Sequence, residues 1–165
     1  MPQIHRITPC FWFDDQGEEA AKFYVSIFPN SKLGKISRYS EAGQEIHQRK
    51  PGSVMTVEFD LDGQSFTALN GGPMFKFTEA ISFQIPCETQ EEIDHYWARL
   101  SEGCDPKSQQ CGWLKDKFGV SWQVVPRILG ELMSDPDPGK ARRATKAMLQ
   151  MKKLDIAALK QAHAG

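Results

Sequence analysis

The stretch "CGWLKDKFGVSWQVVP", residues 111–126, contains two short apolar segments on either side of a charged turn. This arrangement is typical of a β-hairpin that turns near Gly119, with Trp113 and Trp122 on its two strands. A weaker copy, "DLDGQSFTAL", occupies residues 60–69. The two copies share a glycine, a serine and an aromatic residue at one spacing: Gly63, Ser65 and Phe66 against Gly119, Ser121 and Trp122. The repeated hairpin indicates a duplicated unit.

Each hairpin closes a longer segment that begins with a strand and a helix. Asp15 and Glu18 form a capping pattern at the predicted start of the first helix. Thr89 and Glu92 repeat that pattern before the second helix, and the distance from helix to hairpin is shorter in the second copy. The order of elements predicts an α+β protein made of two tandem βαβββ modules.

The two modules are expected to form one domain over residues 1–128. Beyond them, a "DPDPG" break and apolar residues at helical spacing predict a C-terminal helical extension over residues 129–165. From Gly139 onward the chain has seven Lys or Arg residues and a single acid, Asp155, so this basic tail is expected to attract the acidic remainder. No aromatic residues interleave these basic residues, and we therefore expect no nucleic-acid partner.

The composition indicates the cellular compartment in which the chain is expected. The chain has 20 Lys and Arg against 21 Asp and Glu, so its overall charge favours no particular partner. Its four cysteines contain no Cys-x-x-Cys pair, which favours a reducing compartment, and no long apolar run predicts a signal peptide or a membrane span. The expected location is the cytoplasm, without membrane association.

Three stretches resemble one protein family: "ITPCFWFDDQGEEAAKFYVSIFPNS", "FTALNGGPMFKFTEAISF" and "QCGWLKDKFGVSWQVVP". They are similar to the bacterial family labelled 3-demethylubiquinone-9 3-methyltransferase, within the vicinal oxygen chelate superfamily of glyoxalases and bleomycin-resistance proteins. The resemblance covers nearly the whole chain. It implies that the two modules form an incomplete barrel whose concave side holds a metal or a small ligand.

The metal enzymes of that superfamily carry His, Gln or Glu at four positions, which fall here on Thr8, Thr67, Ala80 and Gln123. Of these only Gln123 has a side chain able to ligate, and a divalent metal needs several His or carboxylate ligands. We therefore expect no metal. We also expect no cofactor, because the "LNGG" segment precedes Pro73 and a strand, whereas a methyl-donor loop opens a helix.

Strand alternation predicts that Phe11, Val57, Phe59 and Trp122 pack under the helices and that the opposite face, with Ser65 and Ser121 on it, lines the cleft. The candidate catalytic residues are Glu58, as general base or cation partner, and Gln123; the candidate ligand-binding residues are Thr8, Trp12, Thr67, Asn70 and Gln84. Simpler alternatives stay open: Glu58 as a solvated strand residue, Trp12 in a dimer seam, and the Asn70–Gly72 segment as a turn. Cys10 is expected to be a small buried thiol rather than a nucleophile.

These residues leave three functions open. The first is a small-molecule protein of the vicinal oxygen chelate type without the usual metal, either an enzyme or a binder, and a homodimer because half-barrels expose strand edges. The second is a protein that sequesters a drug or metabolite without catalysis. The third, the methyltransferase of the family label, lacks support in the residues.

Overall fold

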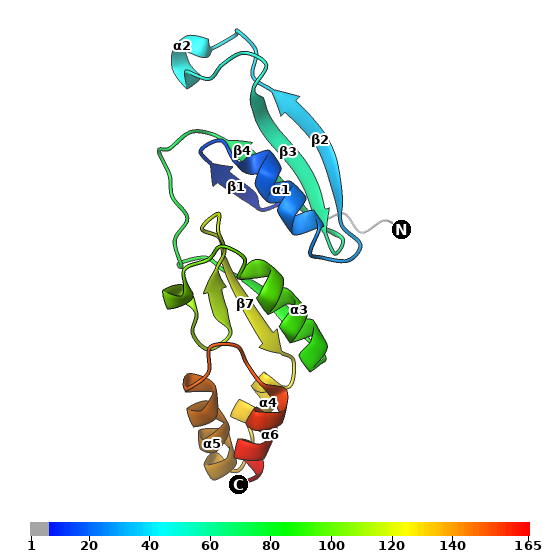
Figure 1. Cartoon of the computed structure of the whole chain (residues 1–165), viewed down its shortest axis with the longest axis vertical. Helices are drawn as coiled ribbons and strands as arrows, with labels where there is room; N and C mark the ends of the chain where they lie inside the picture. The colour runs from blue at the N-terminus through cyan, green and yellow to red at the C-terminus, as the bar shows by residue number, and fades with distance from the viewer. Residues whose placement is uncertain (1–6) are drawn as a thin grey trace. The chain divides into compact units, whose positions relative to one another are not determined.

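The computed structural model describes residues 7–165, which fall into two compact units that meet in sequence between Phe77 and Thr78 (Figure 1). No helix of this described part is long and apolar enough to cross a bilayer. The α+β class, the modular order and the helices after the second hairpin agree with the prediction.

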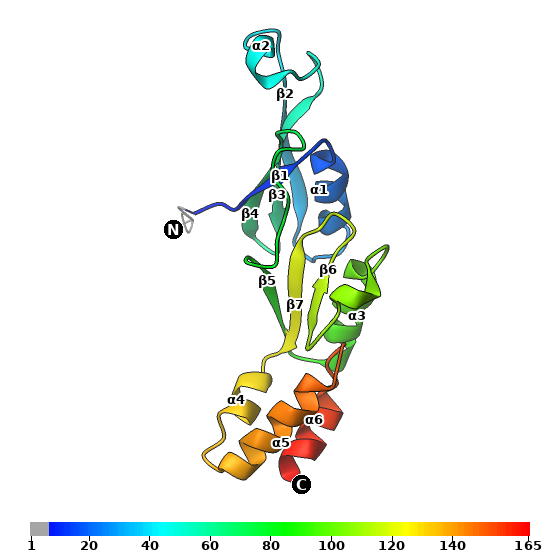
Figure 2. The same cartoon turned by 90° about the vertical axis from the view of Figure 1, so that its left-hand side faces the viewer.

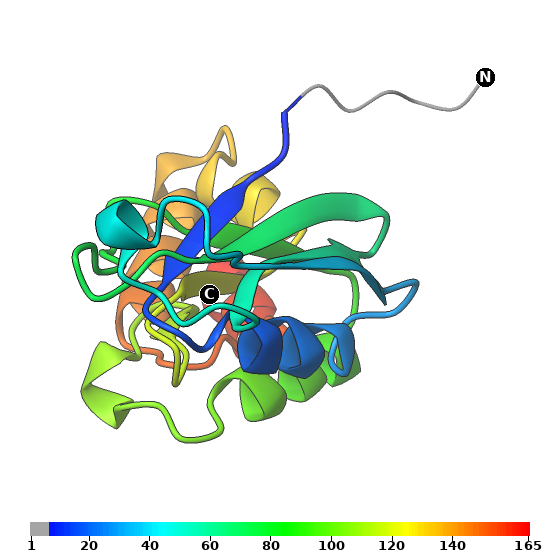
Figure 3. The ribbon, with the colours of Figure 1, turned by 90° about the horizontal axis from the view of Figure 1, so that it is seen from above.

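The first unit has the predicted βαβββ order. It contains β1 (Cys10–Phe13), α1 (Gly17–Val25), β2 (Lys32–Arg38), a short helix α2 (Gln44–His47), β3 (Val54–Leu61) and β4 (Gln64–Asn70). The sheet order is β1-β4-β3-β2, with β1 parallel to β4 and the other pairs antiparallel. Helix α1 lies along one side of these strands (Figure 3).

Aromatic side chains fill the space between α1 and the sheet. Phe11, Phe59 and Phe66 are buried, and the Phe59 and Phe66 rings stack with centroids 5.4 Å apart. Tyr24 of α1 is fully buried against Phe11 and Phe59. This burial confirms the predicted alternation of β1, β3 and β4, since the odd residues of β1 and β3 face the helix.

The start of α1 differs from the prediction. Asp15 was expected to cap the helix, but the N-cap residue is Gln16 and no side chain of the flanking turn accepts the cap hydrogen bond. The Asn70 Oδ1 atom accepts instead from Gly17 N at 2.8 Å, and Asn70 Nδ2 donates to the Val54 carbonyl at 3.2 Å. Asn70 is 5% exposed, so it joins the helix start to the sheet from within the core.

The second unit follows the same order through a shorter connection, as the spacing of the copies predicts, but its sheet has three strands where that of the first unit has four. It contains β5 (Phe83–Cys87), α3 (Gln90–Leu100), a 3-10 turn η1 (Pro106–Ser108), β6 (Trp113–Lys115) and β7 (Ser121–Pro126). The sheet order is β5-β7-β6, and β5 is parallel to β7 as β1 is to β4. Thr89 Oγ1 accepts from Glu92 N at 3.3 Å, which confirms the cap predicted for α3.

The closing hairpin turns around a buried carboxylate. Asp116 Oδ1 accepts from Phe118 N at 2.8 Å and Val120 N at 3.1 Å, and its Oδ2 accepts from Trp122 Nε1 at 2.8 Å. Trp122 is 2% exposed and Gly119 has a φ of 92°, a backbone region that favours glycine. The stretch that reveals the repeat is therefore the end of the second sheet, as expected.

Three helices follow the hairpin and pack on the second unit: α4 (Leu129–Met133), α5 (Pro138–Leu149) and α6 (Ile156–Ala164) (Figure 2). Leu132, Ala144, Leu154 and Leu159 form their buried cluster. The segment after α5 pairs with the backbone before β6, where Cys111 N donates to Met151 O and Gly112 N to Lys152 O.

Candidate functional site

The first sheet carries polar side chains on the face opposite α1. In the β3–β4 pair, Glu58 lies opposite Thr67 and Asp60 lies opposite Ser65. The β1–β4 pair places Cys10 beside Thr67. Because alternate residues of a strand point to opposite faces, these polar side chains share one surface. Phe59 and Phe66, which alternate with them along the strands, point into the core on the other face.

A cavity of about 460 Å³ lies on this face. Its lining comes from the segment before β1 and from β2, β3 and β4: Thr8, Lys32, Gly34, Glu58, Phe59, Asp60, Ser65, Phe66 and Thr67. We call this cavity the Glu58 pocket. It brings together three of the predicted site residues, Glu58, Thr8 and Thr67.

The charges of the Glu58 pocket are not balanced. The Lys32 ammonium lies 3.6 Å from the Asp60 carboxylate, and Ser65 Oγ donates to Asp60 at 2.7 Å. Glu58 is exposed, and within residues 7–165 its carboxylate takes part in no hydrogen bond or ion pair. Asp60 is therefore neutralised by its neighbours, whereas Glu58 remains free to bind a ligand.

Gly34 lets β2 pass close to Glu58. A Cβ atom at position 34 would lie 3.0 Å from Glu58 Cβ and 3.1 Å from the Glu58 carbonyl oxygen. The β2–β3 register shifts between Leu33 and Ile36, so β2 bulges where it passes Glu58. The missing side chain therefore allows this close approach of the two strands, and a methyl group at position 34 would press on Glu58.

Trp12 lies on the same side of the sheet but is engaged by its own unit. Its Nε1 atom donates to the Gly72 carbonyl at 2.8 Å, and a Cβ atom at Gly71 would lie 2.3 Å from the indole ring. The Phe75 ring meets it edge-on, with centroids 4.8 Å apart. Gly71 thus makes room for the indole, and Gly72 accepts its hydrogen bond.

Cys10 is exposed, so the expectation of a buried thiol is wrong. Its neighbours on the sheet nevertheless desolvate the sulfur and raise the pKa of the Cys10 thiol. Because the thiolate is the reactive form, Cys10 is not activated as a nucleophile. Cys87 is buried, and desolvation raises the pKa of its thiol to about 12.

Gln84 and Gln123 lie in the second unit, on adjacent strands. Gln123 Nε2 donates to Ser82 Oγ at 2.8 Å, and Gln84 Nε2 lies 3.5 Å from Gln123 Oε1. Ser121, expected on the same open face, is 2% exposed, and its hydroxyl has no hydrogen-bond partner in the described part of the chain. The second unit therefore has its own polar row, built from amides rather than carboxylates.

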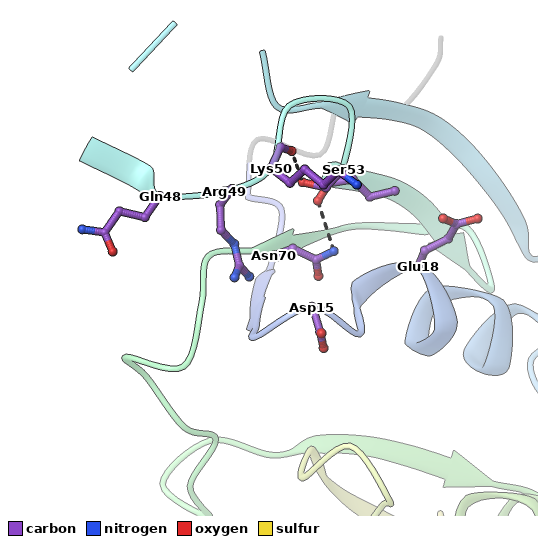
Figure 4. A pocket seen from close by; sticks show the side chains of 8 residues that line it. Asp15, Glu18, Gln48, Arg49, Lys50, Ser53 and Asn70 are labelled. Carbon is purple, nitrogen blue, oxygen red and sulfur yellow. Dashed lines mark hydrogen bonds between the residues drawn. The ribbon is translucent and has the colours of Figure 1, made fainter. Parts of the chain in front are cut away.

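A second hollow of about 320 Å³ lies beside the start of α1 (Figure 4). It is lined by Asp15, Glu18, Gln48, Arg49, Lys50, Ser53, Val54 and Asn70. Its four charged side chains are two acids and two bases, and two of the four are in ion pairs: Arg49 lies 3.5 Å from the Asp14 carboxylate, and the Lys22 ammonium lies 2.6 Å from Glu18. Asn70, predicted to bind ligand, uses its amide to tie the helix to the sheet. The balanced charges make this hollow a weaker candidate than the Glu58 pocket.

The side chains at the superfamily's metal positions do not fit a divalent metal. They offer two hydroxyls, a methyl group and an amide: Thr8, Thr67, Ala80 and Gln123. Within residues 7–165, no three His, Cys, Asp or Glu side chains converge on one point. Divalent metals in proteins take several imidazole, thiolate or carboxylate ligands.

The glycine segment that follows β4 does not form a methyl-donor loop. Strand β4 ends at Asn70, and the chain then runs without a helix to β5 at Phe83. A nucleotide-type loop needs a helix start directly after the strand, because its backbone amides hold the ligand. Gly71 and Gly72 serve the packing of Trp12 instead.

Sequence reasoning missed two parts of the site. Lys32 lines the pocket beside Asp60, yet the two residues are far apart in the sequence and no local signal shows that they meet. Gly34 had a weak signal, since an isolated glycine in a strand often marks a bulge or a close backbone approach.

Comparison with known proteins identifies a matching family and several similar structures. A family model described as 3-demethylubiquinone-9 3-methyltransferase matches residues 5–125. A PhnB protein from Bacillus cereus with the same description is 38% identical, over 74% of this chain and 99% of its own, with a TM-score of 0.62. A Pseudomonas aeruginosa protein is 17% identical over 74% of this chain and 98% of its own, with a TM-score of 0.55, and shares the fold. No curated protein matches the chain.

Proposed function

Since the chain belongs to the family described as 3-demethylubiquinone-9 3-methyltransferase, we propose that it binds a small molecule in the Glu58 pocket, as a protein of the vicinal oxygen chelate type that works without the usual metal ligands. The family predicted from the three sequence motifs is confirmed by the model match and by the Bacillus cereus relative. The name of the family does not set the reaction, because function depends on the residues of the site rather than on the fold.

The unpaired carboxylate of Glu58 carries the proposal. It stands in a cavity of about 460 Å³, within the volume range of small-molecule sites. Thr8, Ser65 and Thr67 line the same cavity, and their hydroxyl groups can both donate and accept hydrogen bonds. A few polar groups that converge in a cavity beside a free carboxylate are typical of a ligand site.

Gly34→Ala is expected to weaken ligand binding about tenfold, because one methyl group in a pocket changes binding free energy by roughly 1–3 kcal/mol. The experiment is a thermal-shift screen of small metabolites on the wild-type chain, followed by calorimetric titration of the hits on both proteins. Gly130→Ala is the matched control, since a Cβ atom there meets nothing within 4 Å. Hits that bind the Gly34→Ala protein as tightly as the wild type would rule out the Glu58 pocket.

The same hits separate an enzyme from a protein that only sequesters its ligand. An enzyme converts the compound over time and loses that turnover in Glu58→Gln, because a general base or cation partner must be ionised there. A sequestering protein binds one equivalent and leaves the compound unchanged, as mass spectrometry of the mixture would show.

We further propose that the chain acts as a homodimer in the cytoplasm. The location is supported by four free thiols, which suit a reducing compartment. Dimer formation is supported by three apolar residues between β4 and β5 that are exposed to solvent: Met74 is 77% exposed, Phe75 57% and Ile81 70%. Light scattering after gel filtration is expected to give twice the 18.6 kDa of the chain, and a Phe75→Glu variant is expected to run as a monomer. A wild-type monomer at high micromolar concentration would contradict the proposal.

A further inference from the structure

We infer that the ligand of the Glu58 pocket is an organic cation, with an ammonium group that binds the Glu58 carboxylate. This inference rests on the proposed function and adds the chemical class of the ligand. It follows from the charges that line the cavity and from the way in which they are paired.

The pocket has a net negative charge. Two carboxylates, Glu58 and Asp60, face one ammonium group, Lys32. Lys32 lies on the Asp60 side, 3.6 Å from that carboxylate and 76% exposed, so it supplies little charge to Glu58. A ligand with a positive charge gains from this field, whereas a carboxylate or phosphate would be repelled.

The neighbours of Glu58 suit a hydrogen-bond donor. Thr67 lies directly opposite Glu58 in the β3–β4 pair, so its hydroxyl shares the same face of the sheet. An ammonium group carries three donors and no acceptor. The Glu58 carboxylate and the hydroxyl groups of the pocket can accept these donors together, and a hydrogen bond to a charged group contributes about 1.5–3 kcal/mol, roughly 10–150-fold in affinity.

The hollow beside α1 offers a comparison within the same unit. Its acids and bases balance, since Asp15 and Glu18 stand against Arg49 and Lys50. The Glu58 pocket differs because its two acids, Glu58 and Asp60, face a single base, Lys32. This difference favours a cation site over β3 and β4 rather than in the hollow beside α1.

The test uses three aromatic probes of similar size and different charge: protonated benzylamine, benzyl alcohol and benzoate. Each is titrated into the full ¹⁵N-labelled chain at neutral pH and followed by backbone NMR. Benzylamine is expected to shift the amides of Gly34 and Thr67 and to bind at least about tenfold more tightly than benzyl alcohol. Raising the salt concentration is expected to weaken the amine alone.

Three variants assign the effect to the pocket charge. Glu58→Gln is expected to remove the advantage of the amine over the alcohol. Lys32→Ala is expected to strengthen amine binding a few-fold, because it leaves Asp60 unpaired, and a gain in affinity cannot come from misfolding. Glu45→Gln, an exposed acid of α2 outside the pocket, is expected to change nothing.

The outcomes separate the two proposals. If benzyl alcohol or benzoate shifts the pocket amides and binds as tightly as the amine, the cation class is wrong while the pocket remains a ligand site. If no probe shifts an amide of the pocket, or if Glu58→Gln binds the amine as well as the wild type does, both the class and the role of Glu58 fail.

Discussion

Asp116→Ala is expected to lower the free energy of unfolding by about 3 kcal/mol, because it leaves buried donors without an acceptor. The carboxylate is 4% exposed and accepts from two backbone amides of the turn and from Trp122 Nε1. A net hydrogen bond contributes about 1 kcal/mol, and an unsatisfied buried donor costs more than that. Urea unfolding, followed by circular dichroism, measures the change.

The matched control is Asp105→Ala. Asp105 also accepts from a backbone amide two residues later, Lys107 N at 2.9 Å, but it is exposed. Its loss is expected to cost below about 1 kcal/mol, since water replaces the acceptor. An Asp116→Ala protein that loses no more than this control, with the Trp122 indole proton unmoved in the NMR spectrum, would show that the carboxylate does not organise the hairpin.

Gly112→Ala is expected to cost about 2–3 kcal/mol and to loosen the C-terminal helices. Gly112 has a φ of 83°, which is unfavourable for alanine by roughly 1–2 kcal/mol. The added Cβ atom would also lie 2.8 Å from the Val124 carbonyl oxygen and 3.0 Å from Leu154 Cδ1. Both contacts lie where the chain after α5 pairs with residues 111–112. The clash therefore disturbs the hydrogen bonds that hold the C-terminal helices against the second sheet.

Hydrogen exchange distinguishes a local opening from general destabilisation. The amides of Cys111 and Gly112, which donate to Met151 and Lys152, are expected to lose protection first in Gly112→Ala. Gly130→Ala, in the open part of α4, is expected to be neutral or to stabilise by up to about 1 kcal/mol. A Gly112→Ala protein as stable as Gly130→Ala would contradict the proposed role of Gly112 in holding the C-terminal helices against the sheet.

Local pattern predicted most of the fold. Alternation in β1 and β3 identified Phe11, Val57 and Phe59 as buried, and the capping residues before α3 identified Thr89. These features depend on residues within a few positions of each other. The same hairpin pattern that revealed the repeat also located Trp122 in the core.

Long-range contacts were beyond prediction from one sequence. Asn70 caps α1 from a strand 53 positions away, so the local candidate Asp15 was a misleading signal. Gly112 meets Leu154 only after the C-terminal helices have packed. The site shows the same limit: alternation found Glu58 and Thr67, but the pairing of Lys32 with Asp60, which leaves Glu58 as the free charge, required the sheet register.

The most direct test of the Glu58 pocket is a crystal structure of the full chain grown with protonated benzylamine at a concentration that saturates it in solution. We predict density in the pocket over β2, β3 and β4, with the ammonium nitrogen about 3 Å from the Glu58 carboxylate. Benzylamine bound only elsewhere, such as in the hollow lined by Arg49 and Asn70, or a pocket with no ligand density, would contradict the assignment of this face as the ligand site.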